Sequence, residues 1–300
     1  MKTPMSTPAL LRAIQLGMGT LGRLSPAGAA HLGAYLAFRP QRHSPRPWEV
    51  EALGRARPVR LAGPRGFSAG HCWEPATEVR GTVLMLHGWE GRASQFGHLG
   101  PLLAGRGLRA IALDAPGHGQ SPRGDGGPGE WIATLRLAAA EIGPLHGLVG
   151  HSLGSVASLL AIESGLSVPR LALIAPPVGV GPRMETAADR LGLEGAARSR
   201  FLTLTIERMV RGGGVADLTD RVAASAPPTL ILHAPDDCDV PIDEGRRLAR
   251  AMPDARFVTT DAIGHFKILR DPESLGIVER FLAADADGST AVDRSLEQVV

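Results

Sequence analysis

The chain has 300 residues, 44% hydrophobic and 21% charged, a globular composition that excludes disordered and fibrous proteins. Its 32 basic and 30 acidic residues give a formal net charge of +2, far from the clustered positive charge that nucleic-acid binding requires, so no nucleic-acid partner is expected. The two cysteines lack the spacing of a zinc site or a disulfide framework, so we expect a reducing, cytoplasmic compartment.

The N-terminal region, residues 1–56, is expected to be a helical arm followed by a linker. Residues 9–38 carry Leu, Ile and Met at roughly helical spacing, but Arg12, Arg23 and Pro26 interrupt them before they reach the length of a membrane span. Neither a transmembrane helix nor a signal peptide is expected. We expect these helices to pack on the domain or to form a loose arm rather than to lie on a membrane surface.

A segment rich in proline and arginine, residues 40–66, follows this arm. Such a composition does not sustain a helix and indicates a linker into the main domain, which we expect to span residues 57–284. The last residues, 285–300, are polar and small, which indicates a mobile tail.

Within the domain, short runs of branched aliphatic residues alternate with longer helical patterns. Runs without a polar face are typical of strands in a parallel sheet that is covered on both sides. The βαβα order therefore predicts an α/β fold with a mostly parallel, doubly wound sheet. The expected strands are residues 82–87, 108–114, 145–150, 171–175, 229–233 and 256–260. The expected crossover helices are residues 94–105, 130–142, 152–164, 244–252 and 272–284.

One interval, residues 176–227, lacks a strong strand signal. It contains helical patterns at residues 183–197 and 200–211, which predict a small helical cap inserted into the domain. The walls of a substrate pocket would come from this cap, and no motif in it indicates a particular substrate.

The strongest chemical signal is Gly150-His151-Ser152-Leu153-Gly154, between an apolar run and a helical pattern. This is the setting of a nucleophilic serine on a tight strand-to-helix turn, where the two glycines permit close backbone approach. The alternative is that Ser152 only caps the following helix.

A serine nucleophile needs a neutral imidazole that takes its proton. His265 follows the last expected strand, and Gly264 before it permits a turn, so His265 is the expected general base. A surface-loop histidine is the alternative interpretation. His151 is not expected to be the base, because neighbouring side chains on a tight turn diverge.

Three aspartates, Asp236, Asp237 and Asp239, follow the expected strand at residues 229–233 and are candidates for the carboxylate that orients the base. Asp239 is expected to cap the next helix. Cys238 is expected to be a small packed residue rather than a second nucleophile.

The loop at residues 87–91, His-Gly-Trp-Glu-Gly, follows the first expected strand. A negatively charged tetrahedral oxygen needs preorganised donors, and the backbone N–H groups of Trp89 and Leu153 are expected to supply an oxyanion hole. The residues expected beside the substrate are Gly88, Glu90 and His151.

The turn at residues 114–121 contains Asp114 and His118, which are expected to satisfy its backbone rather than to act in catalysis. The histidines are scattered, without a metal-binding spacing, and no phosphate-binding loop is present, so neither a metal nor a cofactor is expected.

Together these segments resemble the α/β-hydrolase superfamily, in the group of lysophospholipases, esterases and serine aminopeptidases. The resemblance covers residues 58–284. It implies that Asp237, which opens an Asp-x-x-Val-Pro string, is the acid of the triad, and that Trp89 and Leu153 supply the oxyanion donors. Because residue 152 is serine rather than aspartate, dehalogenase and epoxide hydrolase chemistry is not expected. The matching motifs, in the order of the family, are residues 86–89, 114–119, 150–154, 237–241 and 264–265.

The expected function is hydrolysis of a carboxylic ester of a small or lipid-like substrate, through an acyl-enzyme on Ser152. An acyltransferase or a thioesterase on the same triad is the enzymatic alternative. A catalytically silent scaffold that serves as a binding module, and a peripheral membrane lipase that uses residues 9–38, are further alternatives. The sequence leaves acyl length, leaving group and oligomeric state open.

Overall fold

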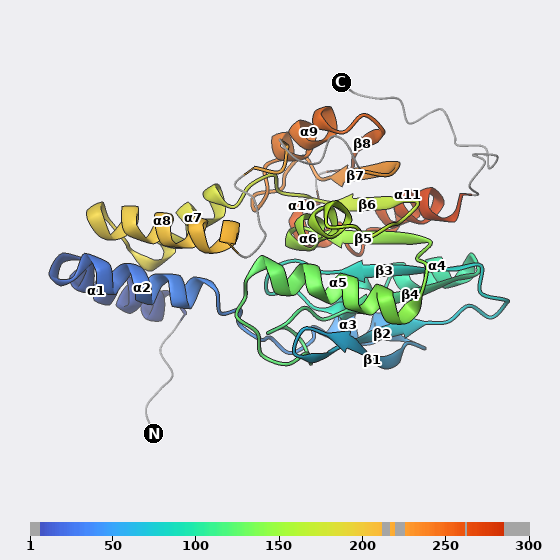
Figure 1. Cartoon of the computed structure of the whole chain (residues 1–300), viewed down its shortest axis with the longest axis horizontal. Helices are drawn as coiled ribbons and strands as arrows, with labels where there is room; N and C mark the ends of the chain where they lie inside the picture. Colours follow the sequence, from blue (N-terminus) through green and yellow to red (C-terminus); the bar gives the residue numbers. More distant parts are fainter. Residues whose placement is uncertain (1–6, 212–216, 220–225, 262, 285–300) are drawn as a thin grey trace. The chain divides into compact units, whose positions relative to one another are not determined.

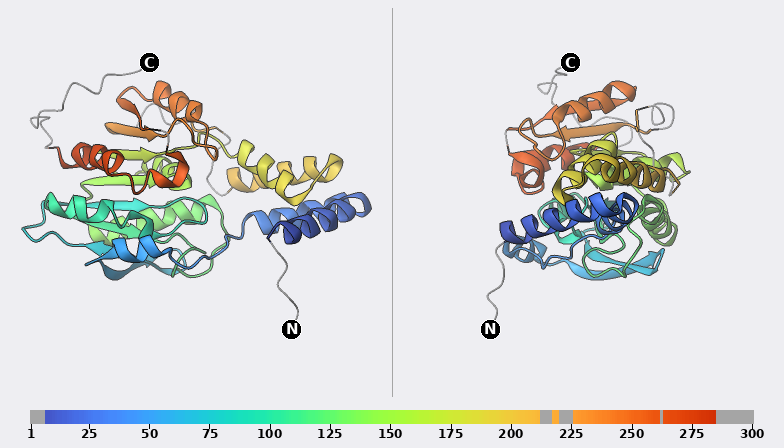
Figure 2. Two further views of the ribbon diagram at one scale, coloured as in Figure 1. Left: turned by 180° about the vertical axis from the view of Figure 1, so that it is seen from behind. Right: turned by 90° about the vertical axis from the view of Figure 1, so that its left-hand side faces the viewer.

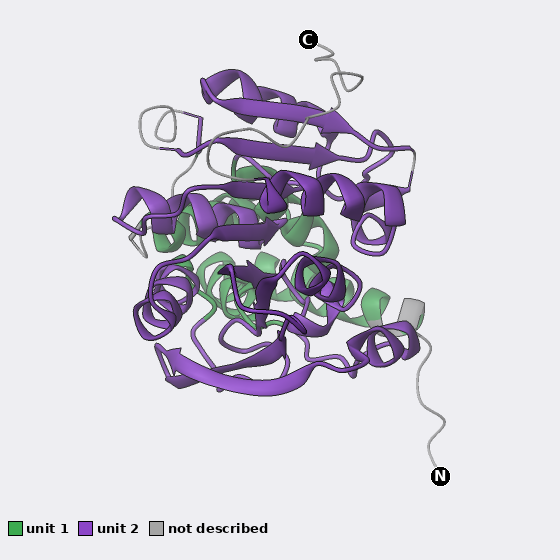
Figure 3. Cartoon of the chain, turned by 90° about the vertical axis from the view of Figure 1, so that its right-hand side faces the viewer, with its two compact units in different colours: residues 1–40, 126–128, 179–217 green, residues 41–125, 129–178, 218–300 purple. Residues whose placement is uncertain are grey.

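The computed structural model describes residues 7–211, 217–219, 226–261 and 263–284. It divides into two compact units, shown in green and purple in Figure 3. The helical unit comprises residues 1–40, 126–128 and 179–217, and the sheet unit comprises residues 41–125, 129–178 and 218–300, in both cases as far as they are described. The tail predicted at residues 285–300 and part of the cap predicted at residues 176–227 lie outside the described residues.

An eight-stranded sheet forms the centre of the sheet unit, in the order β1-β2-β4-β3-β5-β6-β7-β8. The β1–β2 and β2–β4 pairs are antiparallel, and all other pairs are parallel, which confirms the mostly parallel sheet. All six predicted strands are present, each with both ends within two residues of the prediction. The strands are β1 (Arg57–Gly63), β2 (Gly66–Trp73), β3 (Gly81–Leu86), β4 (Leu108–Leu113), β5 (Gly147–His151), β6 (Leu171–Ile174), β7 (Thr229–His233) and β8 (Ala255–Thr259).

Helices flank this sheet, as Figure 1 and Figure 2 show. Side chains alternate along β3, so that Val83 and Met85 point into the core beneath α4 and α11, whereas Leu84 and Leu86 point to the opposite face. Burial on both faces explains the continuous apolar runs of the central strands. The helices of this unit are α3 (Pro47–Leu53), the 3-10 helix η1 (Ala93–Phe96), α4 (Leu99–Gly105), α5 (Pro128–Ile142), α6 (Leu153–Glu163), α9 (Ile242–Ala251), α10 (Gly264–Lys267) and α11 (Pro272–Ala283).

The segment at residues 40–66 is more ordered than its composition predicts. It contains α3 and β1, so the expectation that it cannot sustain a helix is wrong. Pro47 occupies the first turn of α3, where the missing N–H of proline costs no hydrogen bond. Strand β1 is an edge strand without a fully buried residue, so it lacks an apolar run, and neither β1 nor β2 was predicted.

The helical unit consists of α1 (Thr7–Leu24), α2 (Pro26–Ala37), α7 (Gly181–Leu191) and α8 (Gly195–Arg211). Its core contains residues of all four helices, so α1 and α2 pack on α7 and α8. The buried residues of this core are Met18, Ala29, Ala30, Ala188, Leu193, Ala197 and Phe201. Among the described residues, no helix is both long enough and apolar enough to span a bilayer.

Candidate active site

Ser152 lies on the turn between β5 and α6 and has the left-handed backbone conformation φ 52°, ψ −120°. This conformation is strained for a residue with a side chain. A Cβ on Gly150 would overlap the backbone of Ser155, and one on Gly154 would overlap the carbonyl oxygen of Leu86, so both glycines are sterically required. Ser152 holds the N-cap position of α6, but its side chain makes no capping hydrogen bond. The interpretation that Ser152 only caps the helix is therefore wrong.

His265 and Asp237 form a direct hydrogen bond. His265 Nδ1 lies 2.7 Å from Asp237 Oδ2, and both side chains are buried. The other carboxylate oxygen, Asp237 Oδ1, accepts from the N–H groups of Asp239 at 2.9 Å and Val240 at 2.8 Å. With the carboxylate oriented by these bonds, the imidazole donates from Nδ1 and keeps Nε2 free to accept a proton. His265 is thus not a surface-loop residue.

The ionised form of Asp237 is favoured by its surroundings. Burial alone would raise the pKa of Asp237, but the nearby imidazoles of His233 and His265 and the Val240 N–H outweigh burial and hold it well below its usual range. His233 Nε2 lies 3.6 Å from Asp237 Oδ2, too far for a strong hydrogen bond, and 2.8 Å from the carbonyl oxygen of Val240. His233, at the end of β7, lies beside the Asp237 carboxylate, and the sequence interpretation did not name it as a site residue. Its position at the end of a predicted strand could have indicated this role.

The other two aspartates of this loop have different roles. Asp236 Oδ1 accepts from the N–H of Gly264 at 2.7 Å, so Asp236 holds the start of the loop that carries His265. Pro241, not Asp239, is the N-cap residue of α9, so the capping role predicted for Asp239 is wrong. Cys238 is exposed and not packed as predicted.

His151 connects the turn at Ser152 to the loop at His265. It is fully buried, and its Nε2 lies 3.1 Å from the carbonyl oxygen of His265, with the two rings 4.7 Å apart. Burial lowers the pKa of His151 well below its usual value, so the ring is neutral and donates from Nε2. The side chain of His151 thus lies inside the protein, and the predicted place beside the substrate stays a prediction. Among the described residues, no hydrogen bond joins Ser152 Oγ to His265.

The loop after β3 touches the nucleophile turn. A Cβ on Gly88 would lie 2.8 Å from the Cβ of Ser152, so only glycine permits this approach. Within the described part of the chain, the N–H groups of Trp89 and Leu153 have no hydrogen-bond partner, and Leu153 begins α6, where helix N–H groups are free. Glu90 accepts from the N–H of Gln41 at 3.1 Å.

The loops beside the site are braced by two neutral histidines. His87 Nε2 accepts from the N–H of Ala115 at 3.0 Å, and His118 Nε2 accepts from the N–H of Glu90 at 3.1 Å. Burial lowers the pKa of His87 to about 4 and that of His118 to about 3. Asp114 accepts from backbone N–H groups at 2.7 and 2.8 Å, so Asp114 and His118 bond the backbone as predicted.

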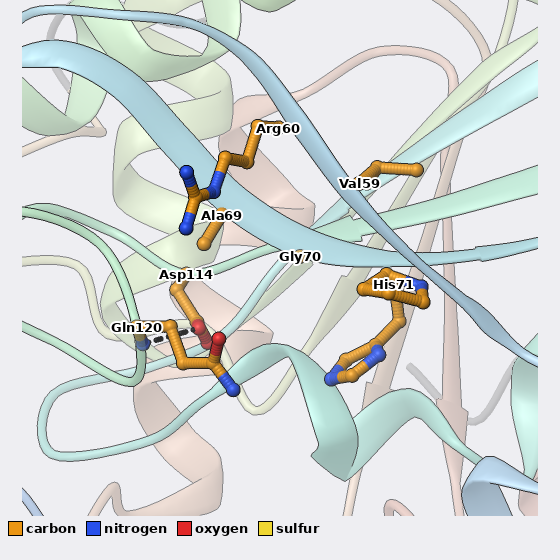
Figure 4. Close-up of a pocket in the computed structure, with 8 residues that line it drawn as sticks. Val59, Arg60, Ala69, Gly70, His71, Asp114 and Gln120 are labelled. Carbon is orange, nitrogen blue, oxygen red and sulfur yellow. Dashed lines mark hydrogen bonds between the residues drawn. The ribbon is translucent and has the colours of Figure 1, made fainter.

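A cavity of about 410 Å³ lies beside β1 and β2, and Ser152, Asp237 and His265 do not line it (Figure 4). Figure 4 shows the hydrogen bond that the N–H of Gln120 donates to Asp114. The Asp114 carboxylate therefore binds the backbone of its own turn. The lining residues are Pro58, Val59, Arg60, Ala69, Gly70, His71, Asp114 and Gln120.

Comparison with known families decides which superfamily this arrangement represents. Residues 81–193 match the model of the alpha/beta hydrolase fold, and residues 210–286 match a model described as TAP-like protein. The chain belongs to the α/β-hydrolase superfamily. The first match contains the Ser152 turn and the loop of Gly88, and the second contains Asp237 and His265.

Individual relatives of this α/β hydrolase are distant. A serine hydrolase-like protein of Dictyostelium discoideum is 33% identical over 109 residues, which cover 34% of this chain and only 30% of that protein. A monoacylglycerol lipase of Mycolicibacterium smegmatis is 26% identical over 249 residues, with coverage of 67% of this chain and 86% of the lipase. The esterase domain of a Rhodothermus marinus protein shares the fold, with a TM-score of 0.56, 22% identity and coverage of 76% and 96%.

Proposed function

We propose that this α/β hydrolase cleaves a carboxylic ester of a small or lipid-like substrate, with Ser152 as nucleophile, His265 as general base and Asp237 as the orienting carboxylate. The observation that carries the proposal is the 2.7 Å bond between His265 Nδ1 and Asp237 Oδ2, together with Ser152 on a strained turn. A silent scaffold needs neither feature. The esterase named above, which shares the fold, and the lipase, which is similar in sequence, add support.

The proposed reaction has two steps. Ser152 Oγ attacks the ester carbonyl carbon, His265 Nε2 takes the serine proton, and the resulting oxyanion accepts from the N–H groups of Trp89 and Leu153. The protonated His265 then gives its proton to the alkoxide that leaves, and an acyl-enzyme remains on Ser152. A water molecule gives a proton to His265 and attacks this ester, and His265 returns the proton to Ser152 Oγ as the carboxylic acid leaves. Asp237 stays ionised throughout and stabilises the imidazolium.

The first test measures initial rates on a series of p-nitrophenyl esters from acetate to palmitate. Parent protein, Ser152→Ala and Ser164→Ala are compared, because Ser164 is an exposed serine at the opposite end of α6. We expect Ser152→Ala to lower kcat about 10³-fold or more, and Ser164→Ala to keep the parental rate. The preferred chain length would then measure the size of the acyl site.

Two results would contradict the proposal. Parental activity in Ser152→Ala would exclude this serine as the nucleophile. Absence of turnover on every ester, with no acyl adduct on Ser152 by mass spectrometry, would favour a silent scaffold. An acyl adduct that forms but is not hydrolysed by water would favour an acyltransferase, which uses the same residues with another acceptor.

A further inference from the structure

Large apolar side chains are exposed mainly on the two N-terminal helices. Of the thirteen that are strongly exposed in the described part of the chain, seven lie on α1 and α2, although these helices have only 18 and 12 residues. Leu24 is 81% exposed and Leu16 is 73% exposed. A cluster of this kind marks an interaction surface more often than scattered single residues do. Its members are Leu11, Ile14, Leu16, Leu24, Leu32, Tyr35 and Leu36.

The inward face of the same helices consists mostly of small residues, beside Met18 and Leu21. A Cβ on Gly22 would lie 3.2 Å from Ala197, and one on Gly33 would lie 3.1 Å from Phe201, so glycines allow α1 and α2 to approach α8 closely. Ala29 and Ala30 are fully buried beside them. An amphipathic helix that only packs inward places its large apolar residues in the core. Here Met18 and Leu21 face the core, but Leu16 and Leu24 are strongly exposed, which indicates a second apolar environment for this surface.

The charge of this surface has a single sign. Helices α1 and α2 carry the basic residues Arg12 and Arg23 and no acidic residue, and Arg39 follows α2. Among the described residues, Arg12 and Arg23 form no ion pair, and the Arg39 guanidinium stacks 4.1 Å over the ring of Tyr35. The acidic residues of the described helices in this unit all lie on α7 and α8. A second copy of the chain on this face would bring like charges together, because a twofold interface pairs a surface with itself.

We propose that the outward face of the α1–α2 pair docks on a membrane surface that carries anionic lipids. The leucines would enter the boundary between headgroups and acyl chains, and Arg12 and Arg23 would contact lipid phosphates. Tyr35 has the amphipathic ring that is typical of this depth, and it is the only tyrosine of the chain. Figure 1 shows α1 and α2 side by side on one side of α7 and α8 within the helical unit, so both helices can meet one plane.

The test measures binding of the full chain to sedimented vesicles of phosphatidylcholine alone or with about one third phosphatidylglycerol. We expect binding to the anionic vesicles that falls as NaCl rises from about 0.05 to about 0.5 M, because salt screens the arginines. The double variant Leu16→Glu and Leu24→Glu should lower the bound-to-free ratio at least about tenfold. The double variant Arg12→Gln and Arg23→Gln should lower it about fivefold for each arginine lost.

The matched control is the double variant Leu102→Glu and Leu137→Glu on α4 and α5 of the sheet unit, where both leucines are 40% exposed. It should bind as the parent does. Equal binding of all variants, or no preference for anionic vesicles, would overturn the proposal. So would a dimer in size-exclusion chromatography that the Leu16 and Leu24 changes dissociate without any vesicle binding. The assay involves no ester turnover, so its failure would leave the proposed hydrolysis untouched.

Discussion

His151 Nε2 lies 3.1 Å from the carbonyl oxygen of His265, so the residue before the proposed nucleophile holds the backbone of the proposed base. The centres of the two rings lie 4.7 Å apart, with the ring planes tilted by 42°, and His151 is fully buried and neutral. The turn after β5 and the loop after β8 are thereby tied to each other. Alignment of Ser152 with His265 therefore depends on a side chain that does not itself need to touch substrate.

The first prediction follows from this bond. His151→Leu removes the donor and should lower kcat about tenfold to a hundredfold with a smaller change in KM, because a displaced base acts mainly in the transition state. His151→Gln keeps an N–H donor and should recover part of the loss. Steady-state kinetics on the best ester of the series measure both values. A large rise in KM at constant kcat would instead assign His151 to substrate binding, as the sequence interpretation had it.

A second prediction separates the two neighbouring aspartates. Asp237→Asn should lower kcat about 10⁴-fold, because an amide no longer holds the productive tautomer of His265. Asp236→Asn keeps an oxygen that can accept from the N–H of Gly264, so kcat should stay within about threefold of the parent. The melting temperatures of both variants are measured as well, so that rates are compared at a temperature where both are folded. The opposite ranking would transfer the role of the triad acid to Asp236.

The sequence predicted the parts of the fold that are buried on both faces. Strands β5, β6 and β7 consist of buried residues throughout, so each appears as an apolar run without a polar face. Strand β1 could not be found in this way, because it lies at the sheet edge and has no fully buried residue. The close packing of α2 on α8 was also hidden, because Gly33 and Ala30 carry no hydrophobic signal in sequence.

For the candidate site, sequence order placed Ser152 and His265 after strands that end at one edge of the sheet. The choice among three aspartates within four residues could not be made from spacing, because it depends on how the loop after β7 folds. In the structure two backbone N–H groups bind Asp237 Oδ1 and leave Oδ2 toward His265. The contributions of His151 and His233 were missed for the same reason, since His151 bonds a carbonyl oxygen far away in the sequence and His233 bonds one in the folded loop that follows it.

A third prediction concerns acid stability. The pKa values of His87 and His118 in the folded protein are about 4 and about 3, below the ordinary 6.5, so the unfolded chain binds protons first as the pH falls. The contribution of these two neutral histidines to stability is therefore complete above pH 6.5. It is lost as the pH falls from 6.5 to their pKa values in the folded protein. The loss should reach several kcal/mol at about pH 4, at about 1.4 kcal/mol for each unit of pKa shift.

Urea unfolding at a series of pH values measures this loss. His118→Asn should be less stable than the parent at pH 7, because the bond to the Glu90 N–H is weakened, but its free energy of unfolding should fall less steeply with acid. Identical slopes for variant and parent would show that His118 does not take up a proton on unfolding in this range.

A fourth prediction tests the contact between the two loops that would form the oxyanion hole. Gly88→Ala places a Cβ 2.8 Å from that of Ser152 and 3.3 Å from His151 Nδ1, so the loop that carries the Trp89 N–H must move away. We expect kcat to fall about a hundredfold, because one misplaced oxyanion donor costs about 3 kcal/mol of barrier. Gly105→Ala is the control, since a Cβ there meets no atom within 4 Å. It should keep the parental kcat and leave stability unchanged or raise it by about 0.5 kcal/mol, because alanine restricts the unfolded chain. A parental kcat in a folded Gly88→Ala protein would remove the loop after β3 from the proposed oxyanion hole.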